Sequence, residues 1–145
     1  MGLFNRYPLG GRFMRRLYRQ SGMLYLPCDR LFGCLMKDAP VLMLIDTGTT
    51  ANVMRSEYVP SGYYSGKTCS MLTAHGEMKA LHCNDVFFTD SIGREYKDDF
   101  LVIDNPVSLK ELEREIKKPV CGILGTYFMD KYGVIINFKK KEILF

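Results

Sequence analysis

The chain has 145 residues, of which 47% are hydrophobic and 25% charged, and its formal net charge is +4. This length suits one compact domain, and this balance of residues argues against wholesale disorder. No stretch approaches the roughly 20 apolar residues of a membrane-spanning helix. We therefore expect a soluble, folded protein without a membrane span, located in the cytoplasm.

The first 22 residues predict a basic arm. Arginines recur along it, and no acidic residue offsets them: Arg6, Arg12, Arg15, Arg16 and Arg19. Such an arm can touch nucleic acid or anionic lipid, or it can be a solvated leader, and we assign it no nucleic-acid partner. The apolar run at residues 23–26 is too short for a secretory signal. We divide the chain into this arm, residues 1–22, and one domain, residues 23–145.

The domain begins with predicted strands. Residues 23–27 and 30–36 are short apolar runs that predict a hairpin. Residues 41–45 form a continuous apolar run, which is typical of a strand covered on both faces. This run ends abruptly at Asp46. A carboxylate therefore terminates a buried strand.

The middle of the chain predicts more antiparallel strands. A glycine- and serine-punctuated loop at residues 61–68 leads to a strand at residues 69–73. The tetrapeptide Ala74-His75-Gly76-Glu77 predicts a hairpin turn, after which residues 78–89 return. Residues 96–103 predict the next strand, so most of the chain is expected to be β.

The last third predicts a capped helix and a closing β segment. Ser108 and Glu111 have the spacing of a capping box, in which each side chain satisfies a backbone donor of the other residue at a helix start. Pro119 ends this helix, whose apolar face consists of Leu109, Leu112 and Ile116. The remaining predicted elements are a strand, a short helix and two final strands, at residues 120–124, 126–131, 133–138 and 142–145.

The tripeptide Asp46-Thr47-Gly48 is the strongest candidate for a chemical site. By itself it is weak, because Asp-Thr-Gly also suits an ordinary strand-to-turn junction. Its context is more specific: an apolar run leads into it, Thr49 follows it, and a second apolar pair closed by glycine, Ile123-Leu124-Gly125, lies much later in the chain. Over roughly residues 24–145 this pattern resembles the retropepsin-like aspartic proteases.

The resemblance implies a fold and roles for individual residues. It implies an all-β protein with one or two short helices, folded as a closed β-barrel that is one protomer of a C2 dimer. Asp46 would be the catalytic carboxylate, Thr47 would brace the two active-site loops against each other, and Gly48 would bring a backbone N–H near the carboxylate. The predicted helix at residues 108–117 departs from the family and looks like an insertion.

Two further segments match the family in position. Ile123-Leu124-Gly125 would brace the strand that carries Asp46. The mobile hairpin that covers the substrate in this family, called the flap, would have its tip at Ala74, His75 and Gly76. Beside the tripeptide, the hydroxyl of Thr49 can donate to the Asp46 carboxylate, or it can bond only to its own backbone. Substrate contacts are expected from these flap and supporting residues.

The chemistry of peptide hydrolysis supports the same assignment. Without a metal or a covalent nucleophile, one group must take a proton from water and another must donate one. Two carboxylates a hydrogen bond apart can do both, because they share a single proton. One Asp46 per chain is one carboxylate short, and a symmetric homodimer supplies the second. We therefore expect an aspartic endopeptidase that acts on extended peptides or proteins and uses no cofactor and no metal.

The main alternative is a catalytically silent module of the same fold that dimerises or holds a peptide without cutting it. A zinc site is disfavoured, because the spacing of its possible ligands matches no compact motif; these are Cys69, His75, His82 and Cys83. A serine or cysteine hydrolase is disfavoured as well, since the sequence has neither a Gly-x-Ser-x-Gly elbow nor a known cysteine signature.

Overall fold

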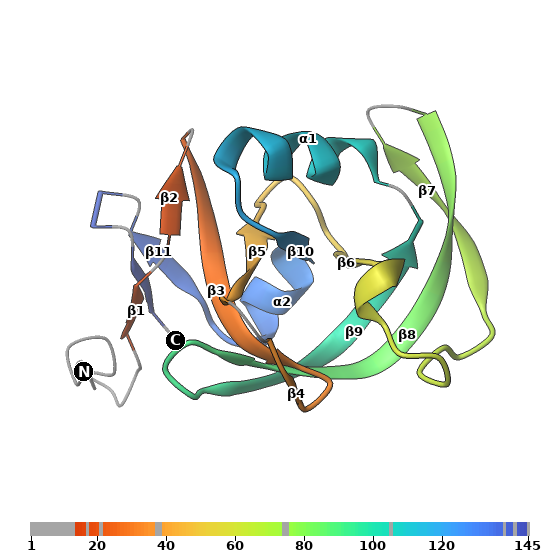
Figure 1. Ribbon diagram of the computed structural model, residues 1–145, viewed down its shortest axis with the longest axis horizontal. Helices are drawn as coiled ribbons and strands as arrows, with labels where there is room; N and C mark the ends of the chain where they lie inside the picture. Colours follow the sequence, from red (N-terminus) through yellow and green to blue (C-terminus); the bar gives the residue numbers. More distant parts are fainter. Residues whose placement is uncertain are drawn as a thin grey trace.

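The computed structural model describes residues 14–16, 18–20, 22–36, 39–73, 76–104, 106–137, 139–140 and 142–144. This part of the chain is mainly β with two α-helices, as predicted. No helix in it is long and apolar enough to cross a membrane. In chain order the elements (Figure 1) are β1 (Met14–Arg16), β2 (Tyr18–Gln20), β3 (Met23–Leu31), β4 (Cys34–Leu35), β5 (Val41–Ile45), β6 (Asn52–Arg55), a short 3-10 helix (Ser56–Tyr58), β7 (Thr68–Thr73), β8 (Gly76–Asp90), β9 (Glu95–Ile103), α1 (Val107–Ile116), β10 (Val120–Leu124), α2 (Thr126–Lys131), β11 (Ile135–Asn137) and β12 (Glu142–Leu144).

Six strands close into a barrel. Their hydrogen-bonded order is β3-β5-β10-β6-β9-β8, and β8 pairs back onto β3. Strands β5 and β6 follow each other in the chain, but β10 lies between them, parallel to β5 and antiparallel to β6. The predicted all-β fold with a closed barrel is therefore confirmed. All five residues of β5 are buried, which confirms a strand covered on both faces.

Strand β3 continues through the break predicted between residues 27 and 30. It is one strand of nine residues, and its hairpin with β4 turns at Phe32 and Gly33, which both have positive φ. The predicted hairpin of residues 23–27 and 30–36 is therefore wrong in its bounds. Polar residues fit inside this strand because its pairing with β8 shifts register between Cys28 and Arg30, so Arg30 is exposed while Cys28 and Leu31 are buried.

A long hairpin extends from the barrel. Strand β8 has 15 residues; its second part pairs with β9 and β3, and its first part pairs with β7. Thr73 lies opposite Gly76, and the residues between them, Ala74 and His75, lie outside the described part of the chain. The prediction that Gly76 and Glu77 belong to the turn is wrong, because both are paired strand residues. Gly76 has a φ of 107°, which other residues rarely adopt.

A second, three-stranded sheet brings together both ends of the described chain, in the order β1-β12-β11. Met14 lies opposite Leu144 and Arg16 opposite Glu142, while β2 pairs with β3 at the edge of the larger sheet. Strands β1 and β2 belong to the predicted basic arm. Part of the arm therefore contributes backbone hydrogen bonds to both sheets, and the division at residue 22 stays a prediction.

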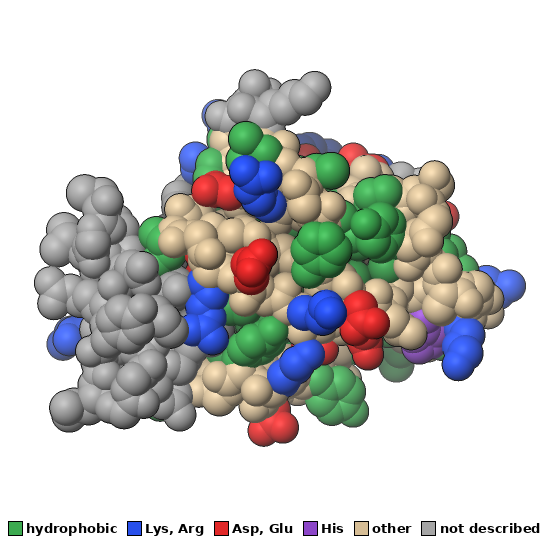
Figure 2. All heavy atoms as spheres, turned by 90° about the horizontal axis from the view of Figure 1, so that it is seen from below, with side chains coloured by type: hydrophobic (Ala, Val, Ile, Leu, Met, Phe, Trp, Pro, Cys, Tyr) green, Lys and Arg blue, Asp and Glu red, His purple; other side chains and the backbone are tan. Residues whose placement is uncertain are grey.

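Aromatic rings fill the interior of the barrel. Phe88 stacks on Tyr96 with ring centroids 5.1 Å apart, and Phe128 of α2 lies 5.9 Å from Phe88. All three are at most 1% exposed, and large buried rings dominate the energetics of a core. The outer face in Figure 2 instead carries basic and acidic side chains interspersed with hydrophobic ones.

Helix α1 begins before the predicted capping box. Its N-terminal cap is Pro106, and no side chain caps this end. Ser108 is already the second helical residue, so the predicted capping box of Ser108 and Glu111 is wrong. Pro106 suits this place because its φ of −70° is compatible with a helix start. The predicted apolar face is confirmed, since its residues are buried or pack against buried ones: Leu109, Leu112 and Ile116.

A buried arginine ties α1 to the barrel. The side chain of Arg55, at the end of β6, is only 5% exposed and forms ion pairs with Glu113 of α1 and with Glu57. It also donates to the carbonyl oxygen of Val120 at 3.0 Å, while Glu113 accepts the Val120 N–H at 3.0 Å. Burial alone would lower the pKa of Arg55, but the two carboxylates more than offset this and raise it above its usual value. The helix is thus held in place by charge as well as by apolar contacts.

We expect Glu113→Ala to lower the free energy of unfolding by about 1–3 kcal/mol, because it leaves the Arg55 guanidinium buried without this partner. Urea denaturation followed by circular dichroism measures the change. Glu111→Ala, at an exposed position of the same helix, is the matched control, and we expect it to stay within about 0.5 kcal/mol of the parent protein. An equal loss in both variants would contradict this role of the ion pair.

Candidate active site

The candidate site forms where β5 ends. Strand β10 runs beside it in parallel, with Ile123 opposite Leu44 and Leu124 opposite Ile45. One residue further, the Asp46 N–H donates to the carbonyl oxygen of Leu124 at 3.1 Å. The ladder therefore continues through Asp46 itself, and β10 determines where the Asp46 backbone leaves the barrel. This is the bracing that was predicted for Ile123 and Leu124.

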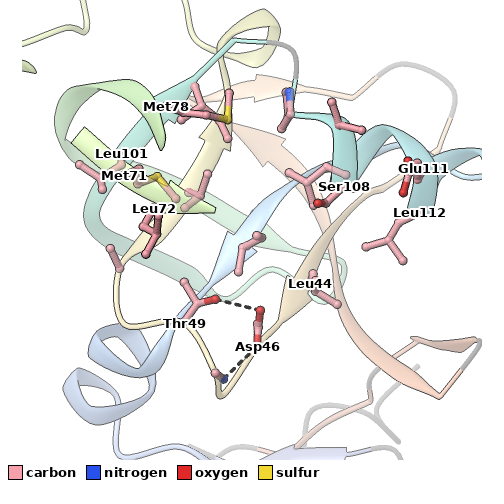
Figure 3. Close-up of a pocket in the computed structure, with 18 of the residues that line it drawn as sticks. Leu44, Asp46, Thr49, Met71, Leu72, Met78, Leu101, Ser108, Glu111 and Leu112 are labelled. Carbon is pink, nitrogen blue, oxygen red and sulfur yellow. Dashed lines mark hydrogen bonds between the residues drawn. The ribbon is translucent and has the colours of Figure 1, made fainter. Parts of the chain in front are cut away.

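Two local hydrogen bonds hold the Asp46 carboxylate (Figure 3). The backbone N–H of Gly48 donates to Oδ1 at 2.9 Å, and the hydroxyl of Thr49 donates to Oδ2 at 2.8 Å. The Gly48 donor was expected from the resemblance, and of the two possibilities for the Thr49 hydroxyl the structure has the bond to the carboxylate. Each oxygen has one donor within the loop, so the carboxylate is oriented while each oxygen keeps a further lone pair for another partner.

Gly125 lets the chain after β10 pack directly against the loop. A Cβ atom at Gly125 would lie 2.6–2.7 Å from the carbonyl oxygens of Thr49, Thr50 and Ala51, which is too close for any side chain. Two of these carbonyls accept hydrogen bonds from the start of α2: Thr126 N–H donates to Thr49 at 2.8 Å, and Tyr127 N–H donates to Thr50 at 3.0 Å. The loop after Asp46 is therefore fixed by contacts with a distant segment.

Asn52 is a supporting residue that the sequence analysis missed. Its side chain is buried, accepts the Gly125 N–H at 3.0 Å, and donates to the Asp98 carboxylate at 2.9 Å and to the Asp99 carbonyl oxygen at 3.0 Å. One amide thus joins the loop, the end of β10 and strand β9. The only signal in the sequence is a polar residue at the start of an apolar run, which does not reveal these partners.

A cleft of about 760 Å³ opens above Asp46. The β7–β8 hairpin forms one wall with Ser70, Met71, Leu72 and Met78, and α1 forms the opposite wall with Val107, Ser108, Glu111, Leu112 and Glu115 (Figure 3). Leu44 and Ile123 lie at its base beside Asp46. Apart from Asp46 and a few polar groups, the cleft is largely apolar, as binding sites usually are.

The structure gathers part of the predicted site in this cleft. Asp46, Gly48, Thr49 and Ile123 line it. Leu124 does not, because its side chain is fully buried in the barrel. Gly125 does not line the cleft either, but packs against the backbone of the loop that follows Asp46.

Two other predicted residues, Thr47 and Gly76, do not line the cleft. Thr47 is exposed, and its predicted role as a brace needs a second chain, so that role stays a prediction. Gly76 begins β8 and does not line the cleft. Ala74 and His75 lie outside the described residues, so the predicted tip of the flap stays a prediction.

The alternative chemistries gain no support from the described residues. Among them no group of three or more His, Cys, Asp and Glu side chains is arranged to hold a metal ion, and His75 lies outside them. Burial raises the pKa of the Cys121 thiol to about 12 and also raises the pKa values of Cys28 and Cys83. These thiols are therefore poor nucleophiles at neutral pH.

In comparisons with known proteins, the sequence matches no protein-family model and no curated protein. A functional assignment therefore rests on the residues and geometry of the site.

We expect Asn52→Ala to destabilise the fold by about 1–3 kcal/mol, because it leaves the buried Gly125 N–H without an acceptor. Thermal and urea unfolding measure the loss. Asn84→Ala, which removes an exposed amide from β8, is the matched control and should have almost no effect. If both variants are equally stable, Asn52 is not the polar link that its hydrogen bonds indicate.

Proposed function

We propose that this chain is one protomer of a retropepsin-like aspartic endopeptidase, active as a homodimer. The observation that carries the proposal is the Asp46 carboxylate, which ends a buried strand, is oriented by Gly48 and Thr49, and faces a cleft walled by a β-hairpin. Together with the resemblance of Asp46-Thr47-Gly48 and Ile123-Leu124-Gly125 to that family, this arrangement favours peptide hydrolysis over other chemistry.

The second carboxylate comes from a second copy of the chain. In an interface with twofold symmetry the same residue of both subunits meets at the axis. Thr47 and Gly48 are exposed beside Asp46, so the loop is accessible to the equivalent loop of a partner. Thr47 is proposed to brace the two loops against each other in that dimer. The Asp46 residues of the two subunits would then share one proton.

The proposed reaction is a direct attack by water. The ionised member of the Asp46 pair takes a proton from a water molecule held between the two carboxylates, and that water attacks the peptide carbonyl. The protonated member donates a hydrogen bond to the oxygen on which negative charge develops. The tetrahedral adduct then breaks its C–N bond, as the Asp46 that took the proton from water gives it to the leaving amine. No covalent intermediate with the protein forms, and the proposed reaction needs no cofactor.

The shape of the cleft favours an extended peptide as the substrate. Strand β7 ends the order of the larger sheet, and an edge strand can pair with an added peptide backbone. Leu72 of β7 lines the cleft and is 86% exposed, so it offers apolar surface to a ligand. The β7–β8 hairpin is the proposed flap, with Ala74, His75 and Gly76 at or beside its tip.

We expect Asp46→Asn to abolish peptide cleavage, because it removes the base while keeping the size and most of the hydrogen-bonding capacity of the side chain. Hydrolysis of a peptide library, read by mass spectrometry, measures the loss. Asp85→Asn is the matched control: Asp85 is exposed and has a φ of 56°, which Asn adopts readily. Cleavage by purified Asp46→Asn would refute the mechanism, and a parent protein that binds peptides without cutting them would be a silent module of the same fold.

We expect specific activity to fall as the protein is diluted, because monomers lack half of the catalytic pair. Sedimentation velocity over the same concentrations should show dimers dissociating in step with the lost activity. Two copies fused through a flexible linker are the control, since the linker keeps their effective concentration high. A monomer that retains full specific activity would contradict the shared site.

A further inference from the structure

Helix α1 presents one defined face to the cleft. Ser108, Glu111, Leu112 and Glu115 recur every three or four residues, the spacing that places side chains on one side of a helix, and all four line the cleft. In Figure 3, Ser108, Glu111 and Leu112 of α1 lie on one side of the cleft, and Met71 and Leu72 lie on the other side. The helix therefore forms the wall that a bound chain would meet across from the β7–β8 hairpin.

The adjoining face of α1 fixes this wall to the barrel. Leu109, which also reaches the cleft, and Ile116 are buried against β5 and β10 residues, and Glu113 holds the buried Arg55 and the Val120 N–H. A helix held by apolar contacts and by an ion pair on one side cannot rotate freely. The residues facing the cleft therefore keep one position relative to Asp46.

Among the described residues, the charges that line the cleft are all of one sign. They are Asp46, Glu111 and Glu115, and no described lysine or arginine lines the cleft, although the whole chain has a net charge of +4. Lys110 and Arg114 belong to the same helix but do not line the cleft. The face shown in Figure 2 carries both signs side by side, so the described lining of the cleft, with only carboxylates as charged groups, differs from that face.

The two carboxylates on α1 are also placed unfavourably for the helix itself. Glu111 and Glu115 are four residues apart, where like charges destabilise a helix. In the described part of the chain neither forms an ion pair. Leu112 lies on the same face and is only partly buried. The wall formed by α1 thus combines one apolar side chain, Leu112, with two carboxylates, and a bound ligand can reach all three.

We propose that α1 determines substrate specificity: the cleft takes extended peptides that place one lysine or arginine side chain against Glu111, Leu112 and Glu115. The apolar stem of a long basic side chain packs on Leu112 while its charged head reaches the carboxylates. This inference rests on the proposed function, because it assigns a substrate class to the same cleft.

Peptide binding to the Asp46→Asn protein tests the proposal without cleavage. The probes are short peptides with an apolar centre, in which one arginine is moved through the flanking positions and compared at each with citrulline, its neutral isostere. Fluorescence anisotropy should give, for at least one position, about fivefold tighter binding of the arginine peptide at low salt. The ratio of the two dissociation constants, citrulline peptide over arginine peptide, should fall as salt is added, because salt screens the attraction between the charges.

The double variant Glu111→Gln and Glu115→Gln, made in the same background, should bring the ratio close to one. The matched control removes two exposed carboxylates away from the cleft, Glu95→Gln and Asp130→Asn, and should keep the preference for arginine. Peptides with a reduced, non-hydrolysable bond, tested on the parent protein, should give the same ratio and exclude an effect of the Asp46 substitution.

Peptide binding tests the role of α1, and peptide cleavage tests the proposed function, so the two can fail independently. Equal binding of arginine and citrulline peptides at every position, absence of binding, or a preference that survives in the double glutamine variant overturns the role of α1. Cleavage of the same peptides by the parent protein is scored separately. Cleavage without a charge preference refutes only the role of α1, whereas a charge preference without cleavage supports that role and refutes the endopeptidase.

Discussion

The position of Asp46 depends on one close contact between distant parts of the chain, that of Gly125 with the backbone of residues 49–51. Gly48 and Thr49 orient the carboxylate from within its own loop, so the path of the loop decides where the carboxylate points. That path is set by β10, which lies between β5 and β6, and by the α2 N–H groups that bond to the loop carbonyls. Any side chain at residue 125 would push these segments apart.

Strand β6 connects this contact to the rest of the molecule through two buried polar side chains. Asn52 at its start links the loop and β10 to β9. Arg55 at its end links the barrel to α1 through Glu113. Buried polar groups are costly unless their partners are present, so networks of this kind favour one arrangement over others. The loop, the barrel and the helix are therefore held in a single geometry.

The cleft above Asp46 joins two unlike walls. One is a hairpin that leaves the barrel with an edge strand and an exposed Leu72. The other is a helix that is fixed to the barrel and presents Leu112 beside two glutamates. In the proposed enzyme the hairpin pairs with the backbone of a peptide, whereas α1 selects among its side chains. Catalysis and selectivity would then be carried by different elements, so substitutions on α1 can change the substrate without changing the reaction.

The sequence by itself determined the features that depend on neighbouring residues. The apolar run before Asp46 predicted a strand buried on both faces. The resemblance implied the Gly48 N–H near the carboxylate, and for the Thr49 hydroxyl the sequence offered two partners within a few residues, the carboxylate and its own backbone. The barrel and the bracing of Asp46 by Ile123 and Leu124 were expected only through the resemblance of the motif. Only the tertiary structure decided the partners of Asn52 and the face that α1 turns to the cleft. The start of α1 follows from Pro106 at its N-terminal cap, whereas the partners of Asn52 and the place of α1 beside the cleft arise from packing between residues far apart in the chain, which the local sequence does not encode.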